Sequence, residues 1–195
     1  FSMLPFSIYR SARCDLHDNP VDLDRADEGK TRLDSLSKIV GVQAQLFSET
    51  VRGPQWAEYY IFPKILGLVE RGWNAHPRWE SLRGEVEQQA FCQDVSRFYR
   101  QLDMQEYPYL IHSGVNVRLP HVGLCVIDGR LYANSPLSSA VIRYTTDGSE
   151  PGTQSTVWRG PVVYPAGCVV KARLYYLGKE SVTTVLFPTD TKSDK

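Results

Sequence analysis

The chain lacks the features that mark membrane-spanning proteins and nucleic-acid-binding proteins. No apolar run approaches the roughly 18 residues that a membrane span requires. The 22 basic and 22 acidic residues cancel to a formal net charge of zero, so charge provides no reason to expect binding to nucleic acid or to an anionic membrane. Residues 1–6 also lack the charged and apolar regions of a signal peptide. If the parent protein is exported, we expect its signal to lie upstream of Phe1.

Motifs for metal binding and nucleophilic catalysis are equally scarce. The four cysteines are too scattered for a Cys-x-x-Cys motif, and the four histidines have no metal-ligand spacing; we therefore expect no metal and no cofactor. Ser48 lacks the Gly-x-Ser-x-Gly elbow of a serine hydrolase. Four aspartates between positions 15 and 24 lack the glycine and terminal glutamate of a calcium loop. We expect each cysteine to be a small buried residue, with a Cys125–Cys168 disulfide as the alternative.

The chain divides into three regions, which predict an α/β part followed by an all-β part. Residues 1–105 form the first part, in which 1–38 are loop-rich and 39–105 alternate between strand and helix patterns. Residues 106–111 are expected to form a linker, because Pro108 should end the preceding helix. Residues 112–195 form the second part, a β-sandwich domain.

Residues 39–105 contain a buried apolar strand that leads into a carboxylate. The strand is expected at 40–47, and Glu49 follows it, as a residue does at the C-terminal mouth of a parallel (β/α) barrel. A helix is expected over 54–73, with its apolar residues on one face, and a second over 82–102. Because Pro63 is tolerated only near a helix start, the alternative is a separate turn at residues 59–62 that leads into the first helix. We expect these apolar faces to be buried in packing rather than to bind a ligand. The residues concerned are Phe62, Leu66, Val69 and Trp73 on the first helix, with Trp56 and Trp79 also structural.

Residues 112–195 show the alternation and turn chemistry of a small antiparallel sandwich of immunoglobulin or fibronectin type. Asp128-Gly129 lies between two apolar runs and predicts a hairpin, and Asp147-Gly148 predicts a similar turn. Strands are expected at 114–119, 124–127, 130–133, 140–146, 162–164, 169–176 and 181–187.

Several motifs, in order along the chain, resemble family-20 glycoside hydrolases, and among these the chitobiase-like β-N-acetylhexosaminidases of bacteria. They are Gln43-Ala44-Gln45-Leu46-Phe47-Ser48-Glu49-Thr50, Glu58-Tyr59-Tyr60-Ile61-Phe62-Pro63-Lys64, Val69-Glu70-Arg71-Gly72-Trp73, Val117-Arg118-Leu119-Pro120, Leu131-Tyr132-Ala133-Asn134 and Ile142-Arg143-Tyr144-Thr145-Thr146-Asp147-Gly148-Ser149-Glu150-Pro151. The resemblance implies the terminal strand and helix elements of a (β/α)8 TIM barrel, followed by the family's C-terminal sandwich. A whole barrel needs about 250 residues, so only part of one can be present.

The resemblance also implies a substrate-binding role for two residues. Glu49 matches the glutamate that accepts hydrogen bonds from the 4- and 6-hydroxyls of the terminal sugar, and an ion pair with Arg52 or Arg71 is its alternative role. Phe47 stands where the family has a tryptophan that walls the sugar pocket. Arg13 stands where the family has a tyrosine for the acetamido group, and Tyr9 is the alternative if the register shifts, so no residue is assigned to that contact.

No catalytic residue is expected in this chain. The resemblance implies an Asp-Glu pair in a His-x-Gly-Gly-Asp-Glu motif, which polarises the substrate's own acetamido group and protonates the leaving oxygen. The nearest adjacent pair, Asp27-Glu28, lacks that context, and solvated charge is its simpler interpretation. The chain alone is therefore predicted to be inactive.

The implied parent enzyme releases terminal N-acetylhexosamine from β-linked chito-oligosaccharides or glycans by substrate-assisted retaining hydrolysis. We expect it to bind that oligosaccharide, and we expect the chain to associate with the remainder of the barrel or with a second copy of itself. The expected location is the periplasm or cell envelope of a Gram-negative bacterium, or outside the cell. The alternative is a non-catalytic sandwich that binds glycan or protein and carries a helical spacer, and a purely structural support domain is a third interpretation. An exposed line of aromatic residues would favour the binding module, and the candidates are Tyr132, Trp158, Tyr175 and Tyr176.

Overall fold

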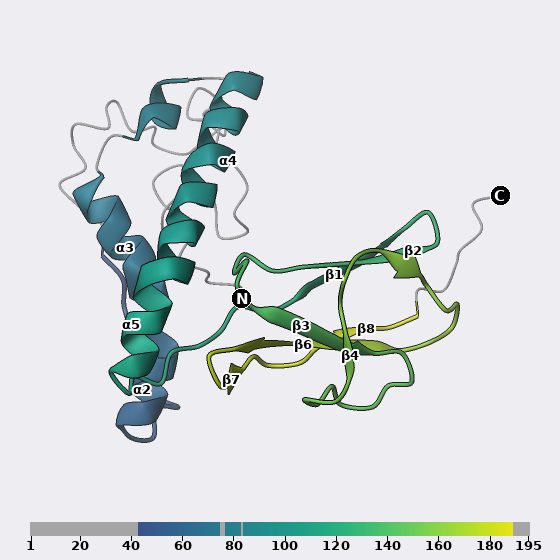
Figure 1. Cartoon of the computed structure of the whole chain (residues 1–195). Coiled ribbons are helices and arrows are strands. Elements are labelled where there is room, and N and C mark those ends of the chain that lie inside the picture. The colour runs from purple at the N-terminus through teal and green to yellow at the C-terminus, as the bar shows by residue number, and fades with distance from the viewer. Residues whose placement is uncertain (1–42, 75–76, 83, 189–195) are drawn as a thin grey trace, which may run out of the picture. The chain divides into compact units, whose positions relative to one another are not determined.

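The computed structural model describes residues 43–74, 77–82 and 84–188 (Figure 1). The chain divides into two compact units. The helical unit comprises Phe1–Val95 and Gly114–Val117, and the β unit comprises Ser96–Ser113 and Arg118–Lys195. Over the described residues, no helix combines the length and the apolar character needed to cross a membrane.

The helical unit begins with two short helices in place of the single helix expected over 54–73. They are α2 (Pro54–Ile61) and α3 (Lys64–Trp73). Gly53 precedes α2 with a φ of 91°, a conformation open to glycine, and Pro54 begins the helix, where a missing N–H costs nothing. The break at Phe62 and Pro63 follows from proline, which has no N–H to donate and whose ring crowds the preceding turn.

The buried strand expected at 40–47 does not form over the part that is described. Residues 43–48 have no regular secondary structure, and each of them is exposed. The backbone then turns at Ser48–Val51, where Val51 N–H donates to the Ser48 carbonyl at 3.0 Å. A barrel strand is held by strands on both sides and a covering helix. All the strands of the described residues belong to the β unit, so this segment has no such support here.

The core of the helical unit lies between the short helix η2 (Arg78–Ser81) and the first part of α4 (Gly84–Gln101). The Trp79 and Phe91 rings meet edge to face with centroids 5.2 Å apart, and Ala90 and Val95 pack against the pair. Trp79 also donates from Nε1 to Asp94 Oδ2 at 3.2 Å. The structural role expected for Trp79 and the helix expected over 82–102 are both confirmed.

Two other tryptophans expected in packing are exposed instead. Trp56 is 50% exposed and Trp73 is 88% exposed, and Val69 on the same face of α3 is 45% exposed. The predicted burial of this face is therefore wrong at Val69 and Trp73, whereas Phe62 and Leu66 are half-buried. Amphipathic spacing shows which side of a helix is apolar, but the partner that buries it must come from elsewhere in the fold.

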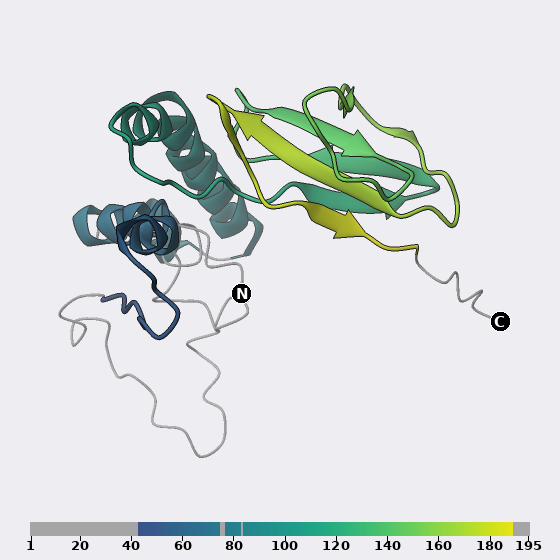
Figure 2. The same ribbon diagram turned by 90° about the horizontal axis from the view of Figure 1, so that it is seen from below.

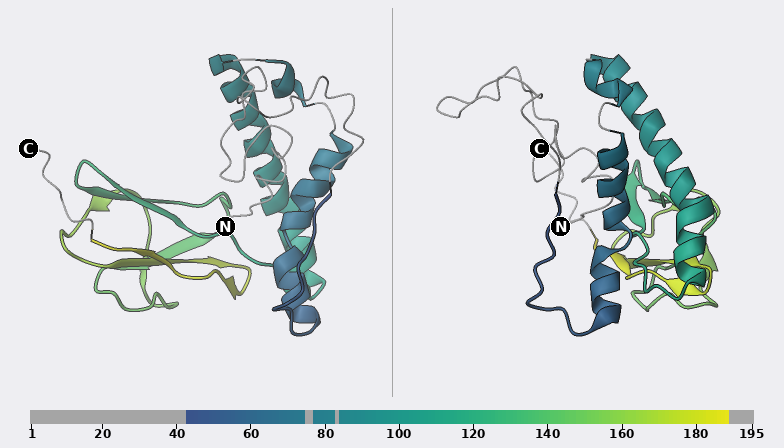
Figure 3. Two further views of the ribbon diagram at one scale, coloured as in Figure 1. Left: turned by 180° about the vertical axis from the view of Figure 1, so that it is seen from behind. Right: turned by 90° about the vertical axis from the view of Figure 1, so that its left-hand side faces the viewer.

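The linker predicted at 106–111 is helical, so that prediction is wrong. Helix α4 continues through a π-helical turn, η3 (Leu102–Glu106), into α5 (Tyr107–His112) (Figure 3). Pro108 lies in the first turn of α5, where its missing N–H is tolerated. Tyr107 and Leu110 are buried, and the boundary between the two units falls earlier, within α4.

The β unit contains two antiparallel sheets, seen in two layers in Figure 2. The three-stranded sheet has the order β1-β2-β5, and the five-stranded sheet has the order β4-β3-β6-β7, with β8 also paired to β6. Both sheets contribute fully buried residues, including Leu131 on β2 and Leu174 on β6. The strands are β1 (Gly123–Ile127), β2 (Arg130–Asn134), β3 (Val141–Thr145), β4 (Thr156–Val157), β5 (Val162–Val163), β6 (Val170–Tyr176), β7 (Lys179–Glu180) and β8 (Thr184–Leu186).

The sandwich expectation is confirmed, with local corrections. The Asp128-Gly129 hairpin forms with φ values of 50° and 69°, as a two-residue turn between twisted strands requires. The strand expected at 114–119 is irregular, and the two-residue strands β4 and β7 were not anticipated. Strands this short carry too few residues for an alternating pattern to reveal them.

Candidate functional site

Glu49 and Phe47 both lie on the irregular segment that precedes α2. Glu49 is one of the two central residues of the Ser48–Val51 turn and is exposed, and the Phe47 side chain is 72% exposed. No ion pair joins Glu49 to Arg52 or Arg71 among the described residues. Arg71 is buried instead, with its guanidinium 5.9 Å from the Trp79 ring centroid, a cation–π arrangement that serves packing.

This placement makes two kinds of contact available to a ligand. An exposed carboxylate accepts charge-assisted hydrogen bonds from hydroxyl groups. An exposed phenyl ring offers an apolar face but no hydrogen-bond donor. The structure thus presents both sequence-predicted residues to solvent, two positions apart on one segment.

A contact that the sequence did not reveal ties residues 114–117 to α2. Asn116 donates from its backbone N–H to Glu58 Oε2 at 2.7 Å and from its side-chain amide to the Gln55 carbonyl at 3.0 Å. The partners are about 60 residues apart in sequence, so no local pattern could have identified them. This contact holds α2 immediately after the segment that carries Glu49.

Three aromatic rings on α2 form a cluster. Trp56, Tyr59 and Tyr60 have ring centroids 6.0 to 6.2 Å apart, within the range of favourable aromatic pairs. Their i, i+3 and i+4 spacing was visible in the sequence, and it places them on one side of the helix.

The four aromatic residues proposed as a binding line on the sandwich are not an exposed line. Tyr132 is half-buried on β2, in the three-stranded sheet. Tyr176 is 5% exposed, and its hydroxyl donates to the Asp103 carbonyl at 2.5 Å. The Tyr175 hydroxyl donates to the Pro151 carbonyl at 2.8 Å, and the Trp158 ring meets Tyr144 edge to face. These residues are used in packing and hydrogen bonding, which counts against the binding-module interpretation.

The Asp147-Gly148 segment makes the turn expected of it. Asp147 Oδ1 accepts from the Ser149 backbone N–H at 3.0 Å and from its hydroxyl at 2.6 Å. These hydrogen bonds to the charged form hold the pKa of Asp147 below its ordinary value. Turn formation is thus the role of this motif.

The cysteines do not follow the burial expected of them. Cys92 and Cys125 are exposed, and Cys125 and Cys168 are separate thiols, so the Cys125–Cys168 disulfide does not form. Within the described ranges, no three side chains of His, Cys, Asp or Glu gather as metal ligands would. The candidates Arg13, Cys14 and Asp27-Glu28 lie outside the described residues.

Comparison with known proteins finds a family match within each of the two units. Residues 9–76 match the catalytic domain of glycosyl hydrolase family 20, and residues 134–187 match the Fn3-associated family. The region that includes the Glu49 turn, α2 and α3 therefore lies within the match to a family-20 catalytic domain, and the β unit is consistent with an appended β domain. The first match implies part of a TIM barrel, although the described residues form no barrel strand.

Named relatives agree with the family match. The chain is 34% identical over 118 residues to N,N'-diacetylchitobiase of Vibrio harveyi, covering 55% of this chain and 13% of that protein. It is 27% identical over 128 residues to beta-hexosaminidase of Vibrio vulnificus (56% and 15%), and 36% identical over 55 residues to beta-hexosaminidase B of Pseudoalteromonas piscicida (28% and 7%). The chain is thus similar to part of the family-20 glycoside hydrolases, as the sequence motifs indicated, and it spans less than a sixth of these relatives.

Proposed function

We propose that this chain is the C-terminal part of a glycoside hydrolase that releases terminal N-acetylhexosamine from β-linked chito-oligosaccharides or related glycans. The observation that carries the proposal is the family-20 match over residues 9–76, supported by relatives named as chitobiase and beta-hexosaminidase. In this proposal the reaction is substrate-assisted and retaining. The catalytic Asp-Glu pair lies on polypeptide outside this chain, and the parent works in the periplasm, in the cell envelope or outside the cell.

In this proposal Glu49 is the substrate-binding carboxylate. It accepts hydrogen bonds from the 4- and 6-hydroxyls of the terminal sugar, and Phe47 contributes an apolar wall. Both side chains are exposed on one short segment. This exposure supports the assignment, because a residue that binds a ligand directly must be accessible to it.

The assignment is tested in the longer protein that carries this segment, with a 4-nitrophenyl N-acetylglucosaminide as substrate. The Glu49→Gln variant keeps the shape of the side chain but loses its charge. We expect kcat/KM to fall about 10- to 100-fold, because this is the effect of losing a charge-assisted hydrogen bond to the substrate. The matched control is Glu85→Gln, an exposed carboxylate in the first turn of α4, which should leave kcat/KM unchanged. Equal kcat/KM for the Glu49→Gln variant and the wild type would refute the role of Glu49.

The position of the catalytic pair is tested with the chain by itself. We expect the 195-residue chain to release no 4-nitrophenol above the rate of buffer, since a substrate-assisted glycosidase needs its acid and its acetamido-polarising carboxylate. Hydrolysis by the isolated chain that survives repurification would contradict the proposal that the pair lies elsewhere.

A further inference from the structure

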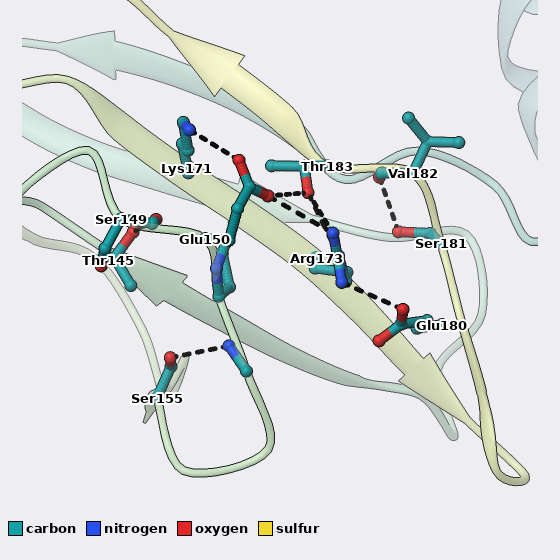
Figure 4. Close-up of polar contacts among 12 residues, drawn as sticks. Thr145, Ser149, Glu150, Ser155, Lys171, Arg173, Glu180, Ser181, Val182 and Thr183 are labelled. Carbon is teal, nitrogen blue, oxygen red and sulfur yellow. Dashed lines mark hydrogen bonds and ion pairs between the residues drawn. The ribbon is translucent and has the colours of Figure 1, made fainter.

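The loop between β3 and β4, residues 146–155, crosses the outer face of the five-stranded sheet, and we call it the strap. It leaves β3, contacts β6, and returns to β4, which pairs with β3 on the side away from β6. Figure 4 shows Glu150 reaching from the strap toward side chains of β6 and of the segment that precedes β8. The two ends of the strap join β3 and β4, and its middle lies over β6.

Glu150 makes the charged contacts that hold the strap. Its Oε1 accepts from Lys171 Nζ at 2.6 Å, and its Oε2 accepts from Thr183 Oγ1 at 2.7 Å and from the Arg173 guanidinium at 3.3 Å. Arg173 also pairs with Glu180 on β7 at 3.1 Å. The Glu150 carboxylate thus joins the strap to two cations of β6 and to the Thr183 hydroxyl, which precedes β8.

Two hydrogen bonds to backbone carbonyls hold the strap on the C-terminal side of Glu150. The Tyr175 hydroxyl donates to the Pro151 carbonyl at 2.8 Å, and the Arg143 guanidinium donates to the Ser155 carbonyl at 2.7 Å. Pro151 is among the most fully buried residues. The strap is therefore fastened to the sheet at Pro151 and Ser155, although most of its residues are exposed.

The outer face beneath the strap is rich in cations. Arg143 lies opposite Arg173 in the β3–β6 register, and Lys171 lies two residues along the same strand, on the same face of the sheet. Glu150 and Glu180 are the carboxylates that pair with these cations. If Glu150 were neutral, the cations would repel one another with less compensation, and the strap would lose its charged anchors.

We propose that the strap is an electrostatic clasp: it stays closed over the sheet while Glu150 is charged, and it opens locally, without unfolding the β unit, when Glu150 is neutral. The argument for local opening is one of magnitude. Glu150 is 57% exposed, and ion pairs at such exposure contribute little individually to global stability. A loop of this length closes at modest entropic cost, so small contacts are enough to decide whether it is open or closed.

The response to pH has a definite sign. Hydrogen bonds from Lys171 and Thr183 to the charged carboxylate hold the pKa of Glu150 below its ordinary value of 4.5. The closed strap is therefore fully favoured above the ordinary glutamate range and is lost only as the pH falls below it. Asp147 is the second acidic group on the strap, and Glu180 faces Arg173 from β7.

The proposal is tested by hydrogen exchange of the whole chain, followed by mass spectrometry of peptides from the strap and from β6. At pH 7 we expect Glu150→Gln to raise the intrinsic-rate-corrected exchange of the strap at least about threefold, with β6 unchanged. The matched control is Glu180→Gln, which removes the other carboxylate on Arg173 without touching the strap, and it should leave strap exchange as in the wild type.

Acidification provides the second arm of the test. Wild-type strap exchange, corrected in the same way, should rise as the pH falls below the ordinary glutamate range and approach that of Glu150→Gln, while the variant shows no further rise. Three outcomes would overturn the proposal: unchanged strap exchange in Glu150→Gln at pH 7, an equal increase in every strand, or an acid response that persists in the variant and so belongs to Asp147.

Discussion

At the scale of single residues, Asp103 connects helix and sheet within the β unit. It lies on the π-helical turn η3 and is 2% exposed. Its Oδ2 accepts from the Ser138 hydroxyl at 2.8 Å and from the Ser139 N–H at 3.0 Å, and its carbonyl accepts from Tyr176. The two hydrogen bonds to Oδ2 compensate for part of the hydration that this buried carboxylate loses, while its Oδ1 has no hydrogen-bond partner among the described residues. This residue therefore anchors the helix to the loop after β2 and to the end of β6.

Replacement of Asp103 by alanine should destabilise the β unit by about 2–4 kcal/mol, because the Ser138 hydroxyl and the Ser139 N–H lose a charged acceptor. Urea unfolding followed by circular dichroism measures the change. Met104→Ala is the control, since Met104 lies on the same turn but is 69% exposed and should change stability by less than about 0.5 kcal/mol. Comparable losses in the two variants would contradict the anchoring role.

The tyrosine that bonds to Asp103 predicts an alkaline limit to stability. Burial, together with the charge and hydrogen bonding of Asp103, raises the pKa of Tyr176 from 10.0 to about 12, and burial also raises the pKa of Tyr107. A folded-state pKa above the unfolded value stabilises the fold below pH 10, and this contribution is lost as the pH rises toward 12. The thermal midpoint should fall more steeply between pH 10 and 12 in the wild type than in Tyr176→Phe, which cannot ionise there. Equal slopes would show that this ionisation is not linked to folding.

At the scale of elements, turn chemistry was a more reliable guide than hydrophobic periodicity. The β1–β2 hairpin formed where Asp128-Gly129 indicated it. Its turn needs positive φ values at two successive residues, and few residue types adopt such values readily, so the residue pair is informative. The helix expected over 54–73 formed as two helices divided at Pro63. On its apolar face Val69 and Trp73 are exposed, whereas Phe62 and Leu66 are half-buried. Periodicity identifies an apolar face but not its partner.

The hairpin makes a quantitative prediction. Gly129→Ala places a side chain at a φ of 69° and should cost about 1 kcal/mol of unfolding free energy. Gly152→Ala is the matched control, because its added Cβ meets nothing within 4 Å and its φ lies outside the left-handed range. Chemical denaturation of both variants provides the comparison, and a Gly129→Ala variant as stable as Gly152→Ala would refute the strained turn.

At the scale of the whole molecule, the chain combines zero net charge with exposed apolar surface on its helical unit. Val69 and Trp73 on α3 are exposed, and patches of this kind mark surfaces that are covered in an assembly. Zero net charge also removes the repulsion that keeps copies apart. In the proposed parent protein the remainder of the barrel covers this face.

We therefore expect the isolated chain to self-associate. Size-exclusion chromatography with light scattering should report a mass above 22.1 kDa that falls with dilution, and the double variant Val69→Glu and Trp73→Glu should shift the chain toward the monomer. A wild-type chain that elutes as a monomer at every concentration tested would contradict this prediction.

The sequence identified the two candidate binding residues, but it did not predict the structure around them. The positions of Glu49 and Phe47 were identified from a motif, and the structure adds that both are exposed. The strand assigned to the residues before Glu49 was wrong over 43–47, because a barrel strand depends on neighbours that local sequence does not supply. The Asn116–Glu58 contact was equally inaccessible from sequence, since no local rule links residues so far apart.

The amino-acid sequence by itself determined the family motifs, the hairpin at Asp128-Gly129 and most strands of the sandwich, because turn conformation and alternation depend on neighbouring residues. Only the tertiary structure decided that Asp103 meets Ser138 and Tyr176, that Glu150 fastens the strap to β6, and that the helix continues past Pro108. The physical reason is that burial and hydrogen bonding between distant segments depend on the path of the chain through space, which no local pattern encodes.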